Sequence, residues 1–191
     1  DLKRVEGYRN FCNKLWNAAR FVLMQTKGQT ITAAPFAEKS AADRWIYGAL
    51  DRTTAAVREA FASYRFDFAA QAVYEFLWNQ YCDWYLELVK PVLAKTNADE
   101  AEKARTRHTL LDVLEQTLRL IHPLMPFISE EIWQQTAPLL GTTGDTLMTQ
   151  PYPAATNGED PQADAEIAWL QETLLGVRKI RADMNIAPGK A

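Results

Sequence analysis

The stretch YEFLWNQYCDWYLELVK, residues 74–90, decides the fold of this chain. It contains five large aromatic side chains besides Tyr74, namely Phe76, Trp78, Tyr81, Trp84 and Tyr85. At the helical repeat of about 3.6 residues per turn, these rings point in several directions and do not share one face. A helix that is apolar on most of its sides lies in the middle of a bundle. We therefore expect this segment to be core and not a base-stacking surface.

Polar residues interrupt this segment at every fourth position, with Glu75, Asn79 and Asp83 on one side of the predicted helix. Residues four apart are neighbours on a helix surface. This face predicts either a polar network between helices or a stripe exposed to solvent, and the pattern itself does not separate the two.

The rest of the chain shows the same helical periodicity, and no segment has the strict alternation of a strand. Ser40 is a suitable N-cap for a helix, and Pro91 is expected to kink the third helix or end its regular part. The expected helices cover about residues 2–26, 41–64, 67–95, 104–121, a short segment after Pro126, and 165–184. The sequence thus predicts an all-α fold, an antiparallel helix bundle over 1–140, followed by a linker or surface excursion over 141–165. Residues 166–191 are expected to hold a C-terminal helix and the start of a truncated subdomain.

The charge of the chain is unevenly distributed. The 191 residues carry a net charge of −3, yet residues 1–27 contain six Lys or Arg and two Asp or Glu, a local balance of +4. A basic first helix on an acidic body hints at an anionic partner. No apolar run approaches the roughly 18 residues of a membrane span, so no membrane partner is expected. Cys12 and Cys82 are interpreted as buried, reduced thiols of a cytosolic protein. Because the chain starts without Met and stops within NIAPGKA, it is interpreted as a piece of a longer protein.

The first helix has two clearly different faces. At about 100° per residue, one arc of roughly 140° is rich in amides and cations, and the opposite arc is apolar. Amides suit base edges, cations suit phosphates, and an exposed phenylalanine can stack on an unpaired base. The other interpretation is that the asparagines bond to a neighbouring helix or cap a loop. The polar arc holds Arg9, Asn10, Asn13, Lys14, Asn17, Arg20, Phe21 and Met24, and the predicted core arc holds Tyr8, Phe11, Cys12, Leu15, Trp16, Ala18, Ala19, Val22 and Leu23.

The sequence contains no pattern typical of an active site. The two histidines, His108 and His122, would lie about 21 Å apart along one helix, too far to share a metal. Each is interpreted as a surface or capping residue, and no metal site is predicted. Phosphate-binding glycine loops and nucleophile elbows are absent from the sequence. Arg178, Lys179 and Arg181 are interpreted as a solvated helix end, with a basic patch beside RNA as the alternative.

Several blocks of the sequence, in order, resemble the bacterial valyl-tRNA synthetases. The resemblance covers nearly the whole chain and is closest in the RNFCNKLWNAARF and CDWYLELVK segments. The isoleucyl, leucyl and methionyl enzymes share the helix bundle and a motif similar to HPLMPF-x-SEEIW. The blocks are GYRNFCNKLWNAARFVL at 7–23, ADRWI at 42–46, YRFDFAAQAVYEFLWNQYCDWYLELVKP at 64–91, RHTLLDVLEQTLRLIHPLMPFISEEIW at 107–133 and VRKIRADMNIAPGK at 177–190.

This resemblance implies the anticodon-binding domain of a class I synthetase that joins valine to its tRNA with ATP and magnesium and edits mischarged threonine. The family's catalytic signatures do not occur here, so this chain is expected to hold no catalytic residue and no cofactor. The implied partners are the anticodon loop of valine tRNA and the catalytic, editing and coiled-coil domains of a monomeric cytoplasmic enzyme. The implied RNA-binding residues are Arg9, Asn13, Lys14, Asn17, Arg20 and Phe21. Two alternatives stay open: a helical protein-interaction module without an RNA role, and the same domain of an isoleucyl enzyme.

Overall fold

The computed structural model describes residues 2–95, 99–156 and 158–186, and within these ranges all regular secondary structure is helical, with no strand. This confirms the predicted all-α class. The α-helices are α1 (Leu2–Thr26), α2 (Ala41–Ala62), α3 (Phe66–Glu75), α4 (Leu86–Ala94), α5 (Glu100–Ile121), α6 (Pro126–Thr136) and α7 (Pro161–Asp183). The shorter elements are η1 (Phe36–Glu38), the π-helical η2 (Phe76–Tyr85), η3 (Ala137–Leu140) and η4 (Leu147–Thr149).

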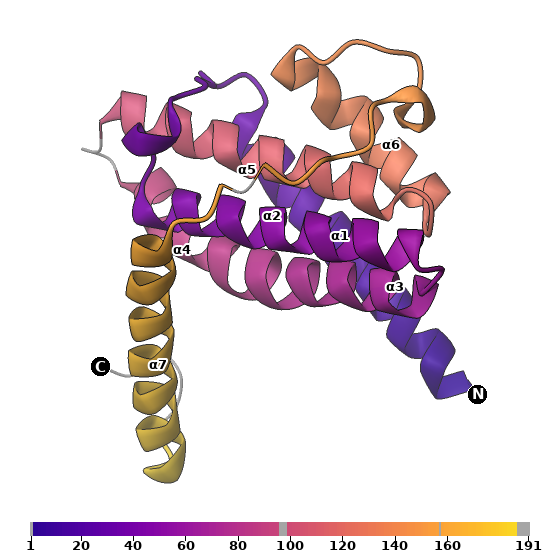
Figure 1. Cartoon of the computed structure of the whole chain (residues 1–191). Helices are drawn as coiled ribbons and strands as arrows, with labels where there is room; N and C mark the ends of the chain where they lie inside the picture. The colour runs from indigo at the N-terminus through magenta and orange to yellow at the C-terminus, as the bar shows by residue number, and fades with distance from the viewer. Residues whose placement is uncertain (1, 96–98, 157, 187–191) are drawn as a thin grey trace.

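Figure 1 shows α2 lying between the continuous α3–η2–α4 helix and α5, with α1 running diagonally behind them. The central helix is α5, which contacts α1, α2, α3, α4 and α6. Five of its leucines are completely buried, namely Leu110, Leu111, Leu114, Leu118 and Leu120. Burial of these side chains is the main driving force for assembly of the bundle.

The aromatic stretch that opens the sequence analysis lies in the core, as predicted. Phe76, Tyr81 and Tyr85 are at most 1% exposed, and Trp78 and Trp84 pack against the core from its border. The helix is not a regular α-helix there, because η2 is wound as a π-helix, with hydrogen bonds between residues five apart. Two hydroxyls of this segment are buried in the bundle: Tyr81 donates to the Leu110 carbonyl at 2.7 Å, and Tyr85 donates to Asp43.

Buried polar groups in the bundle are paired across helices. Asp43, next to the Ser40 N-cap of α2, accepts hydrogen bonds from both Ser40 and Tyr85. Burial raises the pKa of Asp43, and these hydrogen bonds oppose the rise. On α5, the completely buried carboxylate of Glu115 accepts hydrogen bonds from Arg119 and, at 2.8 Å, from the indole nitrogen of Trp133 on α6. Each of these carboxylates therefore fixes one helix against another.

Two helices start earlier than expected. Asp99 and Asp160 act as N-caps, so α5 starts at Glu100 and α7 starts at Pro161, each four residues earlier than predicted. The helix that contains Pro91 continues to Ala94, close to its predicted end at about residue 95.

After η4, residues 150–156 and 158–160 form an extended segment, named the strap here, which crosses α5 and α2 (Figure 1). Three side chains of α2 hold it: Arg58 donates to the Pro153 carbonyl at 3.0 Å, Asp51 accepts from Thr156, and Arg44 pairs with Asp160 at 2.6 Å. Beyond the strap, α7 buries only Ala163 and Ile167 and then projects away from the bundle. The three-part division of the chain into 1–140, 141–165 and 166–191 stays a prediction.

Candidate nucleic-acid interface

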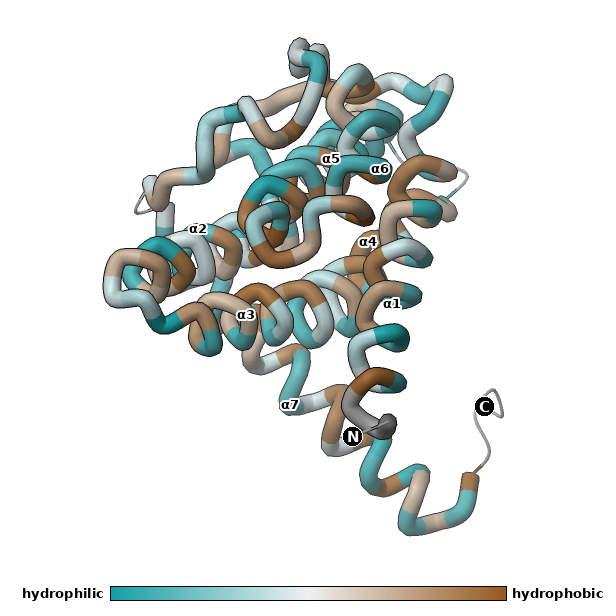
Figure 2. Tube along the Cα trace, turned by 90° about the vertical axis from the view of Figure 1, so that its right-hand side faces the viewer, coloured by the Kyte–Doolittle hydropathy of each residue, from teal (hydrophilic) through white to brown (hydrophobic). Residues whose placement is uncertain are grey.

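The two faces predicted for α1 are present in the structure. Phe11, Leu15, Ala18, Ala19 and Val22 are buried, and Arg9, Asn10, Asn13, Asn17 and Arg20 are exposed. Within the described residues, the amides of Asn10, Asn13 and Asn17 form no hydrogen bond with a neighbouring helix or loop. Figure 2 shows why: α1 lies at one border of the bundle, where only one of its sides meets other helices. The amides are thus available to bind another molecule.

The core face predicted for α1 is wider than the face that the structure buries, and the prediction that Phe21 is exposed is wrong. Tyr8 and Trp16 are 66% and 39% exposed, because a helix at the border of a bundle is covered over a narrower arc than one inside it. Cys12 is only partly buried for the same reason. Phe21 is partly buried and packs against the core instead of standing free. Its ring forms one side of a cavity.

The three predicted cations of α1 have different surroundings. Arg9 forms an exposed ion pair with Glu6 at 3.3 Å on the same helix. Lys14 pairs with Asp83 of η2 at 2.6 Å, and its ammonium lies 3.8 Å from the centre of the Trp78 ring. Arg20 is exposed and has no ion pair or hydrogen bond from its side chain to any residue that the structure describes. Arg20 is therefore the cation of this face that is most available to an anion.

A cavity of about 220 Å³ lies between α1 and the η2–α4 helix. Its α1 side consists of Lys14, Asn17, Ala18 and Phe21, and its other side consists of Cys82, Leu86, Glu87 and Lys90. The Lys90 ammonium lies 5.7 Å from the centre of the Phe21 ring and pairs with Glu87 at 2.5 Å. Burial raises the pKa of the Cys82 thiol to about 12, so this thiol stays protonated and is an unreactive part of the wall. The structure thus brings Lys14, Asn17 and Phe21 together around one cavity, with Asn13 and Arg20 on the exposed face beside it.

Sequence reasoning did not find Glu87 and Lys90 as part of this site. A signal was present, because Glu87 continues the spacing of four residues that connects Glu75, Asn79 and Asp83. In the structure the residues of this stripe are exposed, and Asp83 forms an ion pair with Lys14 on α1. The stripe is therefore both solvated and an interhelical contact, the two alternatives that the sequence left open.

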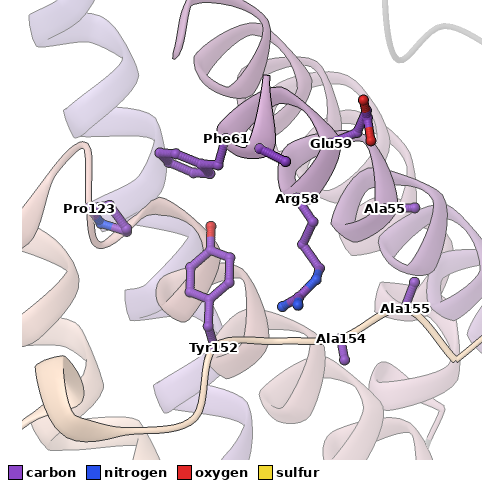
Figure 3. A pocket seen from close by; sticks show the side chains of 9 residues that line it. Ala55, Arg58, Glu59, Phe61, Pro123, Tyr152, Ala154 and Ala155 are labelled. Atoms are coloured by element: carbon purple, nitrogen blue, oxygen red, sulfur yellow. The ribbon is translucent and has the colours of Figure 1, made fainter. Parts of the chain in front are cut away.

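A larger cavity of about 820 Å³ lies between the C-terminal half of α2 and the strap (Figure 3). Arg58, Phe61 and Tyr152 point toward its centre, whereas the carboxylate of Glu59, which also lines it, points away. Arg58 donates to Pro153, and the Tyr152 hydroxyl donates to the Leu120 carbonyl at 3.0 Å. The Phe61 and Tyr152 rings meet edge to face. These side chains hold the strap in place.

No other constellation suggests a chemical site. Over the described ranges, no three His, Cys, Asp or Glu residues are grouped so that they could hold a metal. His122 is the C-cap residue of α5, which is one of the two positions expected for it, and it is buried, with its Nδ1 2.8 Å from the Ser129 hydroxyl. His108 is partly buried, and burial lowers its pKa. Arg178 and Lys179 are exposed on α7, with the Arg178 guanidinium 5.5 Å from the Trp84 ring. None of the helices described here has the length and continuous apolar sequence that a membrane crossing requires.

Comparison with known proteins identifies the class to which this helical bundle belongs. Residues 43–191 match the model of the family described as the anticodon-binding domain of tRNA ligase. The chain therefore belongs to the family of anticodon-binding domains of tRNA ligases.

The chain is also similar to the valine–tRNA ligase of Stenotrophomonas maltophilia (strain K279a). The two are 52% identical over 192 aligned positions, which cover all of this chain and 20% of that protein. The chain thus spans about one fifth of the length of this curated relative. The match to the family model begins after α1, whereas the similarity to the ligase includes α1.

Proposed function

We propose that this chain is the anticodon-binding part of a valine–tRNA ligase and that the exposed face of α1, with the cavity beside it, contacts the anticodon loop of valine tRNA. The observation that supports this most directly is the combination of unpaired amides, an unpaired arginine and a partly exposed phenylalanine on one helix face. Single-stranded RNA loops are recognised through stacking on aromatic rings and hydrogen bonds to base edges. A protein-interaction face would need an apolar centre, and the exposed centre of this face is Asn13 and Asn17.

Each residue of the proposed interface has a role that fits its surroundings. Asn13 and Asn17 offer both donors and acceptors to base edges, and Phe21 offers a ring on which a base can stack. Arg20, which has no partner among the described residues, would bind a phosphate, and Arg9 would do so by exchanging its exposed pair with Glu6. Lys14 is already held by Asp83 and Trp78, so we assign it to the cavity wall.

The activity of the whole ligase requires parts of the protein outside this chain. ATP-dependent charging of tRNA with valine and the editing of mischarged threonine would take place there, and so would the binding of ATP and magnesium. We further propose a monomeric, cytoplasmic enzyme in which this bundle works beside catalytic, editing and coiled-coil domains.

The test is a binding titration with the full-length protein that carries this chain. A labelled anticodon stem-loop of valine tRNA is compared with stem-loops in which each anticodon base is replaced, at two salt concentrations. We expect the replaced loops to bind more weakly at both salt concentrations, because base-edge contacts specify sequence and phosphate contacts do not. Equal affinity for all loops would refute anticodon reading by this domain. Preference for an isoleucine anticodon would favour the isoleucyl alternative.

A further inference from the structure

The larger cavity, which lies between α2 and the strap, has the size and lining of a small-molecule site. Its volume of about 820 Å³ falls within the range of about 300–1,000 Å³ that is usual for ligand pockets. Such pockets are lined mainly by apolar and aromatic side chains, with a few polar groups that converge on the ligand. The apolar part of this lining consists of the rings of Phe61 and Tyr152 and of the smaller side chains of Ala55, Ala62, Pro123, Ala154 and Ala155.

One charged group converges on this apolar surface. Arg58 and Glu59 are the charged residues among those that line the cavity. Figure 3 shows the Arg58 side chain directed toward the centre of the cavity and the Glu59 carboxylate directed away from it. Arg58 forms no ion pair with any residue that the structure describes. A positive charge without a paired carboxylate favours an anionic ligand in this cavity.

The guanidinium of Arg58 keeps one edge available for such a ligand. Its Nη1 donates to the Pro153 carbonyl at 3.0 Å, and this bond helps to hold the strap. Its Nε and Nη2 form no hydrogen bond within the described part of the chain. These two nitrogens form one side of the planar fork, whose parallel N–H groups match the two oxygens of a carboxylate. Arg58 can therefore hold the strap and a carboxylate at the same time.

The surroundings of Arg58 favour a ligand with one negative charge over a phosphate, which carries nearly two. The cavity lies along the C-terminal half of α2, which ends at Ala62. The C-terminal end of a helix carries a partial negative charge, which opposes a dianion more strongly than a monoanion. The rings of Phe61 and Tyr152 favour an aromatic ligand, because they meet edge to face and a third ring can pack against them with similar geometry.

We propose that this cavity binds a small aromatic carboxylate, with the carboxylate on the Nε–Nη2 edge of Arg58 and the ring against Phe61 and Tyr152. No residue of the α1 face is involved, so this inference goes beyond the proposed function and does not depend on it. The bound ligand contacts both α2 and the strap. Because it binds only when the strap is in place, it stabilises the strap against opening.

The experiment uses 2-naphthoate as the probe and its uncharged amide, 2-naphthamide, as the matched control ligand. Binding to the full-length protein that carries this chain is measured by ligand-observed NMR. We expect a Kd for 2-naphthoate on the order of 1 mM or below. The amide should bind at least about tenfold more weakly, because a hydrogen-bonded charge is lost.

Two arginine variants assign the binding to the proposed edge. Arg58→Lys keeps the positive charge but loses the planar fork, so Kd for 2-naphthoate should rise about tenfold. Arg52→Lys is the matched control, because Arg52 also lies on α2 but pairs with Asp164 at 2.8 Å and does not line the cavity. This control should keep the wild-type Kd.

Hydrogen exchange of the full-length protein locates the bound probe. The backbone N–H of Thr156 donates to the Asp51 carboxylate, so its exchange requires the strap to leave α2. At a probe concentration of about ten times the wild-type Kd, this exchange should slow about tenfold in the wild type and about twofold in Arg58→Lys.

Several results would overturn the inference. They are no binding of 2-naphthoate at about ten times the expected Kd, equal affinity for the carboxylate and the amide, and an equal loss of affinity in Arg58→Lys and Arg52→Lys. Slower exchange in other segments with unchanged exchange at Thr156 would place the probe elsewhere and overturn it as well. The stem-loop titration is a separate measurement, so none of these results bears on the proposed RNA-binding role of α1.

Discussion

Replacement of Phe21 by leucine tests whether the ring acts by stacking or by packing. Phe21 is partly buried against the core, so Phe21→Ala would lose part of the 3–5 kcal/mol that truncation of a buried phenylalanine costs. Leucine keeps most of the apolar contact, and such hydrophobic exchanges usually cost less than about 1.5 kcal/mol of unfolding free energy. Leucine has no flat ring, however, and stacking contributes about 1–3 kcal/mol per base. At 1.4 kcal/mol per tenfold, Kd for the anticodon stem-loop should rise about 5- to 150-fold.

The assay is fluorescence anisotropy with the stem-loop at fixed salt, and urea denaturation measures stability. Phe11→Leu is the matched control, because Phe11 lies on the opposite side of α1, is 7% exposed and stacks on Tyr74 with ring centres 5.1 Å apart. The control should lose stability and keep RNA affinity, whereas Phe21→Leu should lose affinity and keep most of its stability. Wild-type affinity in Phe21→Leu would show that the ring only packs, and the stacking role would have to be abandoned.

Three further predictions follow from the described contacts. Arg20→Ala should lower the slope of log affinity against log salt concentration by about 0.7–0.9, the value for one phosphate contact. Lys14→Ala should lower this slope by less than half as much, because the Lys14 ammonium is paired within the protein. Equal effects of the two substitutions would show that Lys14 contacts a phosphate. Glu115→Ala should cost about 1–3 kcal/mol of unfolding free energy in urea, because it leaves the buried Trp133 indole N–H without its acceptor. The partly exposed Arg119 keeps its hydrogen bond to the Pro151 carbonyl. The exposed Glu131→Ala should cost less than about 0.5 kcal/mol, and a loss below about 1 kcal/mol for Glu115→Ala would argue against this network. Because burial raises the pKa of Asp43, its stabilising contribution is greatest below its ordinary pKa of about 4 and declines as the pH rises. The unfolding free energy of the wild type minus that of Asp43→Asn should therefore fall between pH 4 and pH 8, and a rise would contradict the assignment.

The amphipathic division of α1 was predictable from the sequence because helical periodicity is a local property of the chain. Leu15 and Val22 are buried and Asn13 and Asn17 are exposed as the periodicity requires. The error at Trp16 has a simple origin: a periodic pattern gives the direction of a side chain but not how far the neighbouring helices extend around it. A helix at the border of a bundle leaves part of its apolar arc uncovered.

The π-helical winding of η2 was not predictable from helical periodicity alone. A sequence with aromatic residues on all sides shows that the helix is central, as the burial of Tyr81 and Tyr85 confirms. The hydrogen-bond partners of these two tyrosines lie on other helices, namely the Leu110 carbonyl and the Asp43 carboxylate. These partners are separated from η2 by about 30 and 40 positions in the chain.

The sequence by itself determined that the chain is a helical bundle, which segment lies at its centre and which face of the first helix is polar. These properties depend on the order of apolar and polar residues along single helices, because the hydrophobic effect removes the apolar face of each helix from water. Only the tertiary structure decided that Lys14 is held by Asp83, that Phe21 forms a cavity wall, and that Glu87 and Lys90 complete the cavity. Ion pairs and cavities depend on distances between side chains that are about 70 positions apart in the sequence, and only the packing of η2 and α4 against α1 sets those distances.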